Sequence, residues 1–454
     1  MDSAAPWVDD DNAALLVDLY ELTMAQAYWR QGMSQDAVFS LFIRSLQPER
    51  NYFLACGLDS VLRFLENLRF LPEATEYLSS LGMFSQEFLK WLGELRFTGA
   101  VHAVPEGTPV FPDEPVLELV APLPQAQLVE TFLMNQIHSQ TVLASKAARV
   151  VEAAAGRAVV EFGLRRIHGT DAGLKAARVA YIAGATATSN VLAGKTYSIP
   201  VTGTIAHSYI QAHDSEIEAL RNFARLYPET ILLVDTYDTL AGARKVTELA
   251  QELGEDFKIR GVRLDSGDLV QLAFEVREIL DQAGLERLEI FASGGLDEYR
   301  IAAIVERQAP ITGFGVGTRM GVSHDAPSAD TAYKLVEYRG TGRLKLSPGK
   351  PVLPGRKQVF RRREKGRFEG DVIARHGETL PGEPLLRQVM AAGERTPAGR
   401  VSLEESRLWA RQQIEALPNS VRALRPAEPA YPVEISETLL TYQHEVAAGV
   451  RRPG

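Results

Sequence analysis

Short apolar runs alternate with amphipathic stretches in the middle of the chain. Four compact apolar runs each end at polar residues or glycines, and they cover residues 231–234, 259–264, 288–292 and 311–314. The intervening stretches carry apolar side chains at the three- and four-residue spacing of a helix face, over residues 240–253, 268–282 and 297–308. Strands that alternate with helices predict βα units, and therefore a parallel sheet or a barrel.

The flanking regions show other patterns. Residues 15–91 mostly show helical spacing, whereas residues 101–120 form short, proline-punctuated segments typical of β structure. A long helix is predicted over residues 125–155. The sequence becomes β-like again after Tyr333, and an amphipathic helix is predicted over residues 402–417.

Two charged or polar stretches are given structural interpretations. Residues 361–367 contain four arginines and one lysine and are interpreted as the solvated edge of a hairpin. Residues 189–196 resemble a phosphate-binding Walker A loop but lack its first glycine. We therefore expect residues 190–194 to end a helix, with Gly194 just beyond its last turn.

Composition narrows the class of protein. The chain has 454 residues, of which 45% are hydrophobic. This length corresponds to two or three domains with a large core. The formal net charge of −9 argues against binding nucleic acid through overall charge. No apolar run is long enough to span a membrane and the acidic N-terminus has no signal pattern, so we expect a cytoplasmic protein.

Cys56 is the only cysteine, which excludes an internal disulfide and a cysteine-rich zinc site. We expect it to be a small core residue.

Polar residues follow the predicted strands at the edge where parallel folds place their sites. Asp265 and Asp268 flank one strand-to-helix turn, and carboxylates there can bind sugar hydroxyls or Mg²⁺. Helix capping is the simpler interpretation of Asp268 but does not require Asp265. Asp265 is therefore the stronger candidate for function.

Glycines follow the last two strands of the repeat. Residues 315–321, with Glu337 further on, mimic a dinucleotide-binding fingerprint. The following residues contain Pro327 and many turn formers rather than a helix pattern. A phosphate cradle is the better interpretation, because glycines let backbone N–H groups approach phosphate oxygens.

Three further candidates are basic side chains, in two strings. Arg165 and Arg166 follow a predicted strand, and a guanidinium can bind a carboxylate or phosphate with two hydrogen bonds. Phe162, just before them, can stack on a flat ring. His207 is flanked by Thr204 and Ser208; alone it would be interpreted as structural, but the neighbouring candidates favour a chemical role.

Taken together, these motifs closely resemble the nicotinate phosphoribosyltransferase family. The matching strings occur in the family's order across residues 15–360: Asp18-Leu-Tyr-Glu-Leu-Thr-Met24, Glu161-Phe-Gly-Leu-Arg-Arg166, Ser189-Asn-Val-Leu-Ala-Gly194, Gly203-Thr-Ile-Ala-His-Ser208, Val234-Asp-Thr-Tyr-Asp238, Gly261-Val-Arg-Leu-Asp-Ser-Gly-Asp268, Gly313-Phe-Gly-Val-Gly-Thr318 and Tyr333-Lys-Leu335.

The resemblance implies the type II phosphoribosyltransferase fold, an α/β class in which an irregular, TIM-like α/β barrel is joined to an α/β sandwich-like second domain. It implies an N-terminal helical and β sandwich-like domain over residues 1–130 and a barrel catalytic domain over residues 131–344. Residues 345–454 would complete or pack on the sandwich-like domain.

The resemblance also implies a reaction: nicotinate and 5-phosphoribosyl pyrophosphate give nicotinate mononucleotide and pyrophosphate, with coupled ATP hydrolysis. Mg²⁺ is the implied cofactor and ATP a co-substrate. Members of the family are typically homodimers with the active site at the subunit interface. Neither a nucleic acid nor a membrane is expected as a partner.

Roles carry over from the resemblance residue by residue. His207 is similar to the family's phosphohistidine. Tyr20, from the partner subunit, and Phe162 would clamp the pyridine ring. Arg165 would anchor a carboxylate or phosphate, and Arg263 would share that work; Arg166 is a further substrate-binding candidate. Asp265 would meet ribose hydroxyls or Mg²⁺. The remaining candidates are expected at phosphates: Thr204, Ser208, Ser293, Gly294, Gly295, Gly315, Gly317 and Thr318.

Three alternatives remain open at this point. A relative that uses nicotinamide or quinolinate is the nearest, although the strings around Tyr20 and Arg165 favour the branch that uses nicotinate. An NAD(P)-dependent oxidoreductase would rest on residues 315–321 alone. A catalytically silent barrel would not be expected to retain His207, Asp265 and Arg165.

Overall fold

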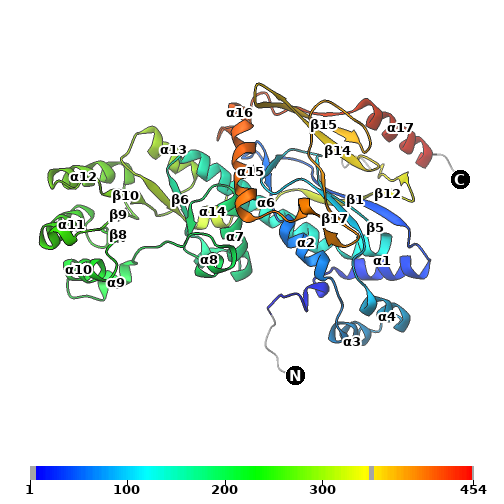
Figure 1. The fold of residues 1–454 in the computed structure, drawn as a ribbon, viewed down its shortest axis with the longest axis horizontal. Coiled ribbons are helices and arrows are strands. Elements are labelled where there is room, and N and C mark those ends of the chain that lie inside the picture. Colours follow the sequence, from blue (N-terminus) through cyan, green and yellow to red (C-terminus); the bar gives the residue numbers. More distant parts are fainter. Residues whose placement is uncertain (1–6, 347–351, 452–454) are drawn as a thin grey trace. The chain divides into compact units, whose positions relative to one another are not determined.

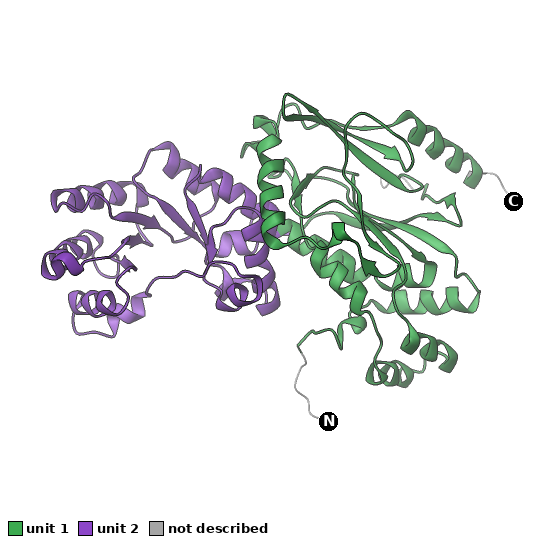
Figure 2. Cartoon of the chain, viewed as in Figure 1, with its two compact units in different colours: residues 1–142, 328–454 green, residues 143–327 purple. Residues whose placement is uncertain are grey.

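A computed structural model describes residues 7–346 and 352–451 (Figure 1). The start of the acidic N-terminal segment therefore lies outside the described residues. The chain divides into two compact units (Figure 2). Unit 1 contains residues Met1–Val142 and Ser328–Gly454, and unit 2 contains Leu143–Pro327. Both ends of the chain thus contribute to unit 1, and the middle forms unit 2.

Unit 2 is built on a six-stranded parallel sheet in the order β7-β6-β11-β10-β9-β8. The predicted βα repeat and its parallel strands are therefore confirmed. The strands are β6 (Ala158–Glu161), β7 (Ala187–Thr188), β8 (Ile231–Leu233), β9 (Gly261–Leu264), β10 (Glu289–Ala292) and β11 (Gly313–Val316).

The helices of unit 2 include the three that the apolar spacing predicts, which are α11 to α13. Each of the three begins after an aspartate whose side chain accepts a hydrogen bond from a backbone N–H of the first turn. The capping interpretation of Asp268 is thus confirmed. The helices are α7 (Thr170–Ile182), α8 (Val191–Tyr197), α9 (His207–Gln211), α10 (Glu216–Leu226), α11 (Thr239–Leu253), α12 (Leu269–Gln282), α13 (Glu298–Glu306) and α14 (Thr318–Gly321), with short 3₁₀ turns at Leu164–Arg166 and Gly254–Asp256.

The interpretation of residues 190–194 as the end of a helix is wrong. Asn190 is the N-cap of α8, and its side chain accepts a hydrogen bond from the backbone N–H of Ala193. Gly194 lies inside the helix, where a Cβ atom would come within 2.1 Å of Val201 Cγ2. The glycine is explained by close packing rather than by a helix terminus.

Unit 1 contains a seven-stranded sheet in the order β13-β12-β1-β5-β3-β17-β18, a four-stranded sheet in the order β16-β14-β15-β19, and the pair β2-β4. Neighbours in the seven-stranded sheet are antiparallel. The strands are β1 (Asp36–Ile43), β2 (Phe53–Ala55), β3 (Ala100–Ala103), β4 (Thr108–Val110), β5 (Pro115–Pro122), β12 (Thr331–Tyr338), β13 (Thr341–Gly342), β14 (Lys357–Glu364), β15 (Arg367–Arg375), β16 (Glu383–Pro384), β17 (Arg387–Ala391), β18 (Glu394–Arg395) and β19 (Val433–Ile435).

The prediction that residues 15–91 are mostly helical misses β1 and β2. Seven of the eight residues of β1 are buried, because β1 lies inside the sheet between β5 and β12. A strand covered on both faces shows no alternation of apolar and polar positions. The apolar run in β1 was therefore not distinguishable from a buried helix segment.

Unit 1 also contains helices. The helix predicted over residues 125–155 is two helices, α5 and α6, which meet at Val129. The helix predicted over 402–417 is α15, which begins with a capping box formed by Ser402 and Glu405. The helices are α1 (Leu19–Arg30), α2 (Leu58–Asn67), α3 (Pro72–Ser80), α4 (Gln86–Glu94), α5 (Leu123–Leu128), α6 (Glu130–Ala153, which continues into unit 2), α15 (Leu403–Ala416), α16 (Asn419–Arg422) and α17 (Glu437–Arg451), with 3₁₀ turns at Ala13–Leu15 and Pro397–Gly399.

Residues 361–367 do lie in a hairpin, but Arg361 contradicts the interpretation as a solvated edge. Arg361 is 0% exposed, and its guanidinium forms an ion pair with the equally buried Asp371 on the neighbouring strand. It also donates to Pro109 O at 2.8 Å, and the Tyr431 hydroxyl donates to Asp371 at 2.9 Å. The hairpin therefore buries the side chain of Arg361, and the ion pair with Asp371 compensates its charge.

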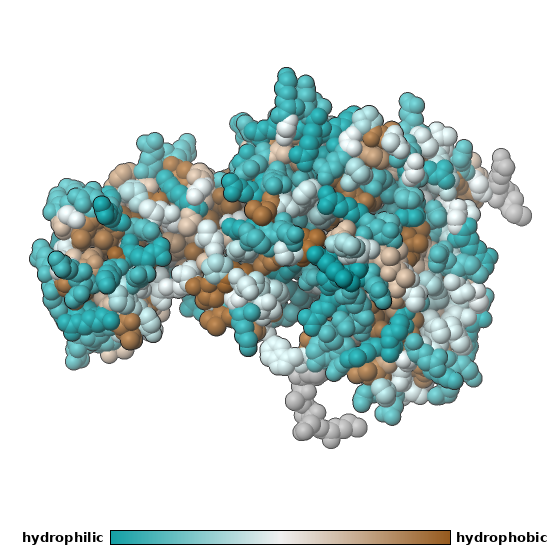
Figure 3. Space-filling view, in the orientation of Figure 1, coloured by the Kyte–Doolittle hydropathy of each residue, from teal (hydrophilic) through white to brown (hydrophobic). Residues whose placement is uncertain are grey.

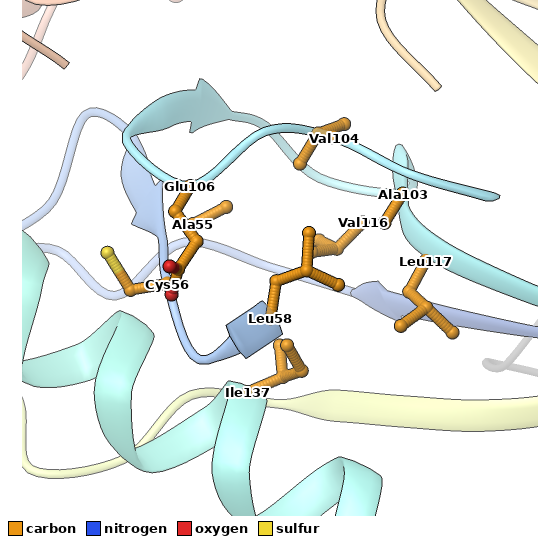
Figure 4. A pocket seen from close by; sticks show the side chains of 9 residues that line it. All are labelled: Ala55, Cys56, Leu58, Ala103, Val104, Glu106, Val116, Leu117 and Ile137. Atoms are coloured by element: carbon orange, nitrogen blue, oxygen red, sulfur yellow. The ribbon is translucent and has the colours of Figure 1, made fainter. Parts of the chain in front are cut away.

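Cys56 is 1% exposed, which confirms that it is a core residue. It lies beside a small pocket of unit 1 (Figure 4), lined mainly by apolar side chains: Ala55, Cys56, Leu58, Ala103, Val104, Glu106, Val116, Leu117 and Ile137.

Apolar residues are interspersed with hydrophilic ones on the face of each unit seen in Figure 3. Among the residues that the structure describes, no helix has the length and apolar character needed to cross a membrane.

Candidate active site

The sheet of unit 2 collects most of the predicted site residues at one edge. Because all six strands are parallel, the segments that follow them lie at the same end of the sheet. Phe162, Arg165 and Arg166 follow β6. Asp265 follows β9, residues 293–295 follow β10, and Gly317 and Thr318 follow β11.

His207 is held by contacts at both ring nitrogens. Its Nδ1 lies 3.1 Å from the Thr236 hydroxyl, and its Nε2 lies 3.9 Å from Asp265 Oδ2. The first distance is a hydrogen bond, whereas the second is too long for one. The side chain of His207 is 39% exposed. Nε2 therefore faces a carboxylate across a gap that is open to solvent.

Asp265 belongs to a hydrogen-bonded network that joins three loops. The Ser293 hydroxyl donates to Asp265 Oδ1. The backbone N–H of Asp265 and the hydroxyl of Ser266 both donate to Asp235 Oδ2, at 3.0 and 2.6 Å. Asp235, which follows β8, thus anchors the turn that carries Asp265. Its other oxygen, Oδ1, is buried and has no hydrogen-bond partner in the described structure.

The backbone of Gly294 packs directly against the backbone of Asp265. It has a φ of +92°, and a Cβ atom would lie only 1.7 Å from the carbonyl oxygen of Asp265. Only glycine fits this conformation and this approach. Gly295, at φ +62°, continues the turn, and its carbonyl accepts from Arg300 at 3.0 Å.

Arg263 lies in β9 and donates to the hydroxyl of Thr204. Burial lowers the pKa of Arg263 below its usual range; Asp265 and Asp235 act in the opposite direction, and Arg165 lowers it further. Arg165 is therefore within electrostatic reach of Arg263. Within the part of the chain that the structure describes, no ion pair or hydrogen bond engages the guanidinium of Arg165 or Arg166, and both are exposed. A cationic region is available for an anion.

Phe162 lies against the sheet, with its ring centroid 6.1 Å from that of Phe291. Gly315 makes room for it, because a Cβ atom there would lie 2.5 Å from the Phe162 ring. Gly315 is a buried residue of β11, so packing explains it, and its phosphate-binding role stays a prediction.

The turn after β11 brings Gly317 and Thr318 to the start of α14. Arg319 forms an ion pair with Asp297, which ties this turn to the loop after β10. Helix α14 has only four residues and is therefore much shorter than the helix that a dinucleotide-binding fingerprint requires. This geometry disfavours the oxidoreductase alternative.

The other predicted residues are placed as follows. Ser208 is exposed in the first turn of α9. Tyr20 lies in α1 of unit 1 and is 46% exposed. Burial raises the pKa of the Tyr20 phenol, and Glu130 and Glu21 raise it further. Next to it, burial raises the pKa of Glu21 to about 8.

No group of three or more His, Cys, Asp or Glu side chains within residues 7–346 and 352–451 has metal-binding geometry. Mg²⁺ is usually held by one or two carboxylates together with substrate phosphates. Asp265 fits that pattern, because no donor within residues 7–346 and 352–451 forms a hydrogen bond to its Oδ2 and its side chain is 36% exposed.

Comparison with known proteins agrees with this geometry. The model of the nicotinate phosphoribosyltransferase (NAPRTase) N-terminal domain matches residues 15–138, and that of the NAPRTase family matches residues 158–370. A nicotinate phosphoribosyltransferase of Mycobacterium tuberculosis is 58% identical over 427 residues, which cover 94% of this chain and 92% of that protein. The chain belongs to the nicotinate phosphoribosyltransferase family.

More distant members of this family show the same relationship. The Bacillus subtilis nicotinate phosphoribosyltransferase is 39% identical over 388 residues, covering 83% of this chain and 79% of that protein. The crystal structure of human nicotinic acid phosphoribosyltransferase superposes with a TM-score of 0.83 at 30% identity, covering 94% of this chain and 99% of that chain. The type II phosphoribosyltransferase fold is therefore confirmed.

Three polar residues that lie at the ends of strands in unit 2 were not proposed from the sequence. Asp235 and Thr236 stand in the quoted string 234–238, and Glu161 opens the string 161–166. Their only signal was a position at the end of an apolar run. Nothing in that pattern showed that they bind neighbouring loops or His207.

Proposed function

We propose that the chain transfers the phosphoribosyl group of 5-phosphoribosyl pyrophosphate to nicotinate, giving nicotinate mononucleotide and pyrophosphate, with ATP hydrolysis coupled to the transfer. The observation that carries this proposal is the shared sheet edge. There the turn after β6, which carries Phe162 and Arg165, lies at the same end of the parallel sheet as Asp265, whose carboxylate is 3.9 Å from His207 Nε2.

The pyridine acid is proposed to bind at the turn after β6. Phe162 offers an aromatic face, and Arg165 is exposed and unpaired among the described residues, so its planar fork can receive the carboxylate. Arg166, exposed next to it, adds positive charge. An amide has no negative charge for this pair, which favours nicotinate over nicotinamide.

The transfer needs little acid–base help. The pyridine nitrogen of nicotinate attacks C1 of the ribose, while the bond from C1 to the pyrophosphate oxygen breaks and the pyrophosphate leaves. The sugar passes through an oxocarbenium-like state. The ring nitrogen is already unprotonated near neutral pH, so no strong base is required, and positioning supplies most of the rate.

Asp265 is proposed to meet the ribose hydroxyls or the metal. When bound, Mg²⁺ neutralises charge on the leaving pyrophosphate. Arg263, with Thr204 at its guanidinium, adds a cation beside Asp265. The turns at residues 293–295 and 317–318 would direct backbone N–H groups toward the 5′-phosphate.

ATP coupling is proposed to run through His207. In the tautomer with the proton on Nδ1, the Nδ1–H group donates a hydrogen bond to the Thr236 hydroxyl. The lone pair is then on Nε2, which lies 3.9 Å from Asp265 Oδ2. Nε2 can then attack the γ-phosphorus of ATP and release ADP; water later cleaves the phosphohistidine. Ser208, the next residue, is proposed to contact the phosphate.

The assay that tests the proposal mixes the protein with 5-phosphoribosyl pyrophosphate, Mg²⁺ and one of three pyridines: nicotinate, nicotinamide or quinolinate. Each reaction is run with and without ATP, and mononucleotide is measured by chromatography. We expect nicotinate mononucleotide, faster formation with ATP, and loss of activity with EDTA. Product only from nicotinamide or quinolinate would contradict the assignment of substrate.

Tyr20 is proposed to act across a dimer, as the other face of the pyridine clamp. Mixed dimers of Tyr20→Ala and Asp265→Ala subunits should then regain activity, because each holds one site in which both residues are intact. A random equal mixture should reach about a quarter of wild-type activity. Mass spectrometry establishes that mixed dimers form. Mixed dimers no more active than the parents would place Tyr20 in its own subunit's site.

A further inference from the structure

Glu161 is a buried carboxylate that the proposed chemistry does not use. It ends β6 and is 1% exposed. No ion pair to Glu161 occurs among the described residues. Burying a carboxylate without a cation is costly, so the hydrogen bonds that Glu161 accepts are needed to offset that cost.

Both oxygens of this carboxylate accept hydrogen bonds from neighbouring loops. Oε1 accepts from the backbone N–H of Gly163, and Oε2 accepts from the Thr188 hydroxyl at 2.7 Å. Thr188 Oγ1 in turn accepts from the backbone N–H of Asn190 at 3.0 Å. Glu161 thereby ties the turn after β6 to the end of β7. Burial raises the pKa of Glu161, while the bonds from Thr188 and Gly163 act in the opposite direction.

The Glu161 carboxylate packs directly against Gly163, where there is no room for a side chain. A Cβ atom at Gly163 would lie 2.8 Å from Glu161 Oε1 and 3.1 Å from Ile167 Cδ1. The first distance is too short for a real contact, so any larger residue would displace the carboxylate. Gly163 stands between Phe162 and Arg165, the two residues proposed to bind the pyridine acid.

We propose that Glu161 is a positioning residue for the pyridine acid: its hydrogen bond to Gly163 sets the direction of the turn that presents Phe162 and Arg165. This inference rests on the proposed function. Because Glu161 is 1% exposed, it would act on substrate through this turn rather than by direct contact. Its effect should therefore fall on nicotinate and leave 5-phosphoribosyl pyrophosphate, which is proposed to bind at the turns after β9 to β11, almost unaffected.

Glu161→Leu removes both acceptors at similar size. We expect KM for nicotinate, and Kd for nicotinate from calorimetry, to rise about tenfold or more, which is the value of one charged hydrogen bond. The KM for 5-phosphoribosyl pyrophosphate should stay within about threefold of wild type. An equal rise in both KM values would mean that the whole edge has moved and would overturn the proposal.

Glu161→Gln separates hydrogen bonding from charge. The glutamine oxygen can still accept from Gly163, with its NH₂ group toward Thr188. Nicotinate KM should thus stay within about threefold of wild type. Thr188→Val is the control, because it removes the bonds of the Thr188 hydroxyl to Glu161 and Asn190 but keeps the bond from Gly163 to Glu161, and it should change nicotinate KM little. If Glu161→Gln were as damaging as Glu161→Leu, the negative charge itself would act and positioning would be excluded.

Gly163→Ala gives a second measurement that does not depend on the folding of Glu161→Leu. The added methyl group should displace the carboxylate and raise nicotinate KM selectively. In the double variant with Glu161→Leu the two effects should not add, because both remove the same bond. Additive effects would contradict the shared mechanism. Failure of the proposed function is distinguishable, since wild type would then make no nicotinate mononucleotide at all.

Discussion

His207→Asn should abolish acid-labile labelling of the protein by ATP labelled at the γ-phosphate, and with it the stimulation of turnover by ATP. Asparagine can replace the hydrogen bond of Nδ1 to Thr236 but has no nucleophilic ring nitrogen beside Asp265. Slow synthesis without ATP should persist, because the residues proposed to bind ribose and pyridine are unchanged. Labelling and chromatographic measurement of mononucleotide, each with and without ATP, check both expectations.

His213 provides the control for this prediction. Its Nδ1 lies 2.8 Å from the carbonyl oxygen of Tyr209, and its ring packs on that tyrosine at a centroid distance of 4.7 Å. His213→Asn should therefore keep the label and the stimulation by ATP. If the label instead persisted in His207→Asn and vanished in His213→Asn, the phosphorylated residue would be His213. A wild-type protein that ATP neither labels nor stimulates would refute the coupling altogether.

Arg165→Lys should lower kcat/KM for nicotinate by about 30- to 150-fold, which corresponds to about 2–3 kcal/mol. Lysine keeps the charge but loses the planar pair of N–H donors that matches a carboxylate. Arg165 is exposed and, within the described structure, has no ion pair to lose, so the melting temperature should not change. Steady-state kinetics with nicotinate as the varied substrate give the measurement.

Arg166→Lys is the matched control for this variant, since Arg166 is the adjacent arginine and is also exposed. We expect a smaller loss there, because the resemblance gives the anchoring role first to Arg165. Wild-type kcat/KM in Arg165→Lys would show that the substrate carboxylate is bound elsewhere, and Arg263 would be the next arginine to test.

The predictions that held depend on local signals. The repeated strands and helices of residues 231–314 were predictable because each element has its own period and its own cap, as Asp268 shows for α12. The missed strand β1 had no such signal, since burial on both faces removes the alternation of a strand. Arg361 was misplaced for the opposite reason: its charge indicates solvent, and only the buried partner Asp371 makes an interior position tolerable.

The sequence by itself determined the βα repeat, the resemblance to the family, and the candidates His207, Asp265 and Arg165. The repeat follows from the local spacing of apolar residues, and the candidates stand in short motifs. Only the tertiary structure decided which of them lie together and what supports them. Asp235 holds the turn of Asp265, Thr236 binds His207, and Glu161 binds the turn between Phe162 and Arg165. The first bond joins the ends of β8 and β9, the second joins the loop after β8 to α9, and the third closes the turn after β6. A hydrogen bond depends on where two atoms meet in space, and residue spacing along the chain does not specify that position.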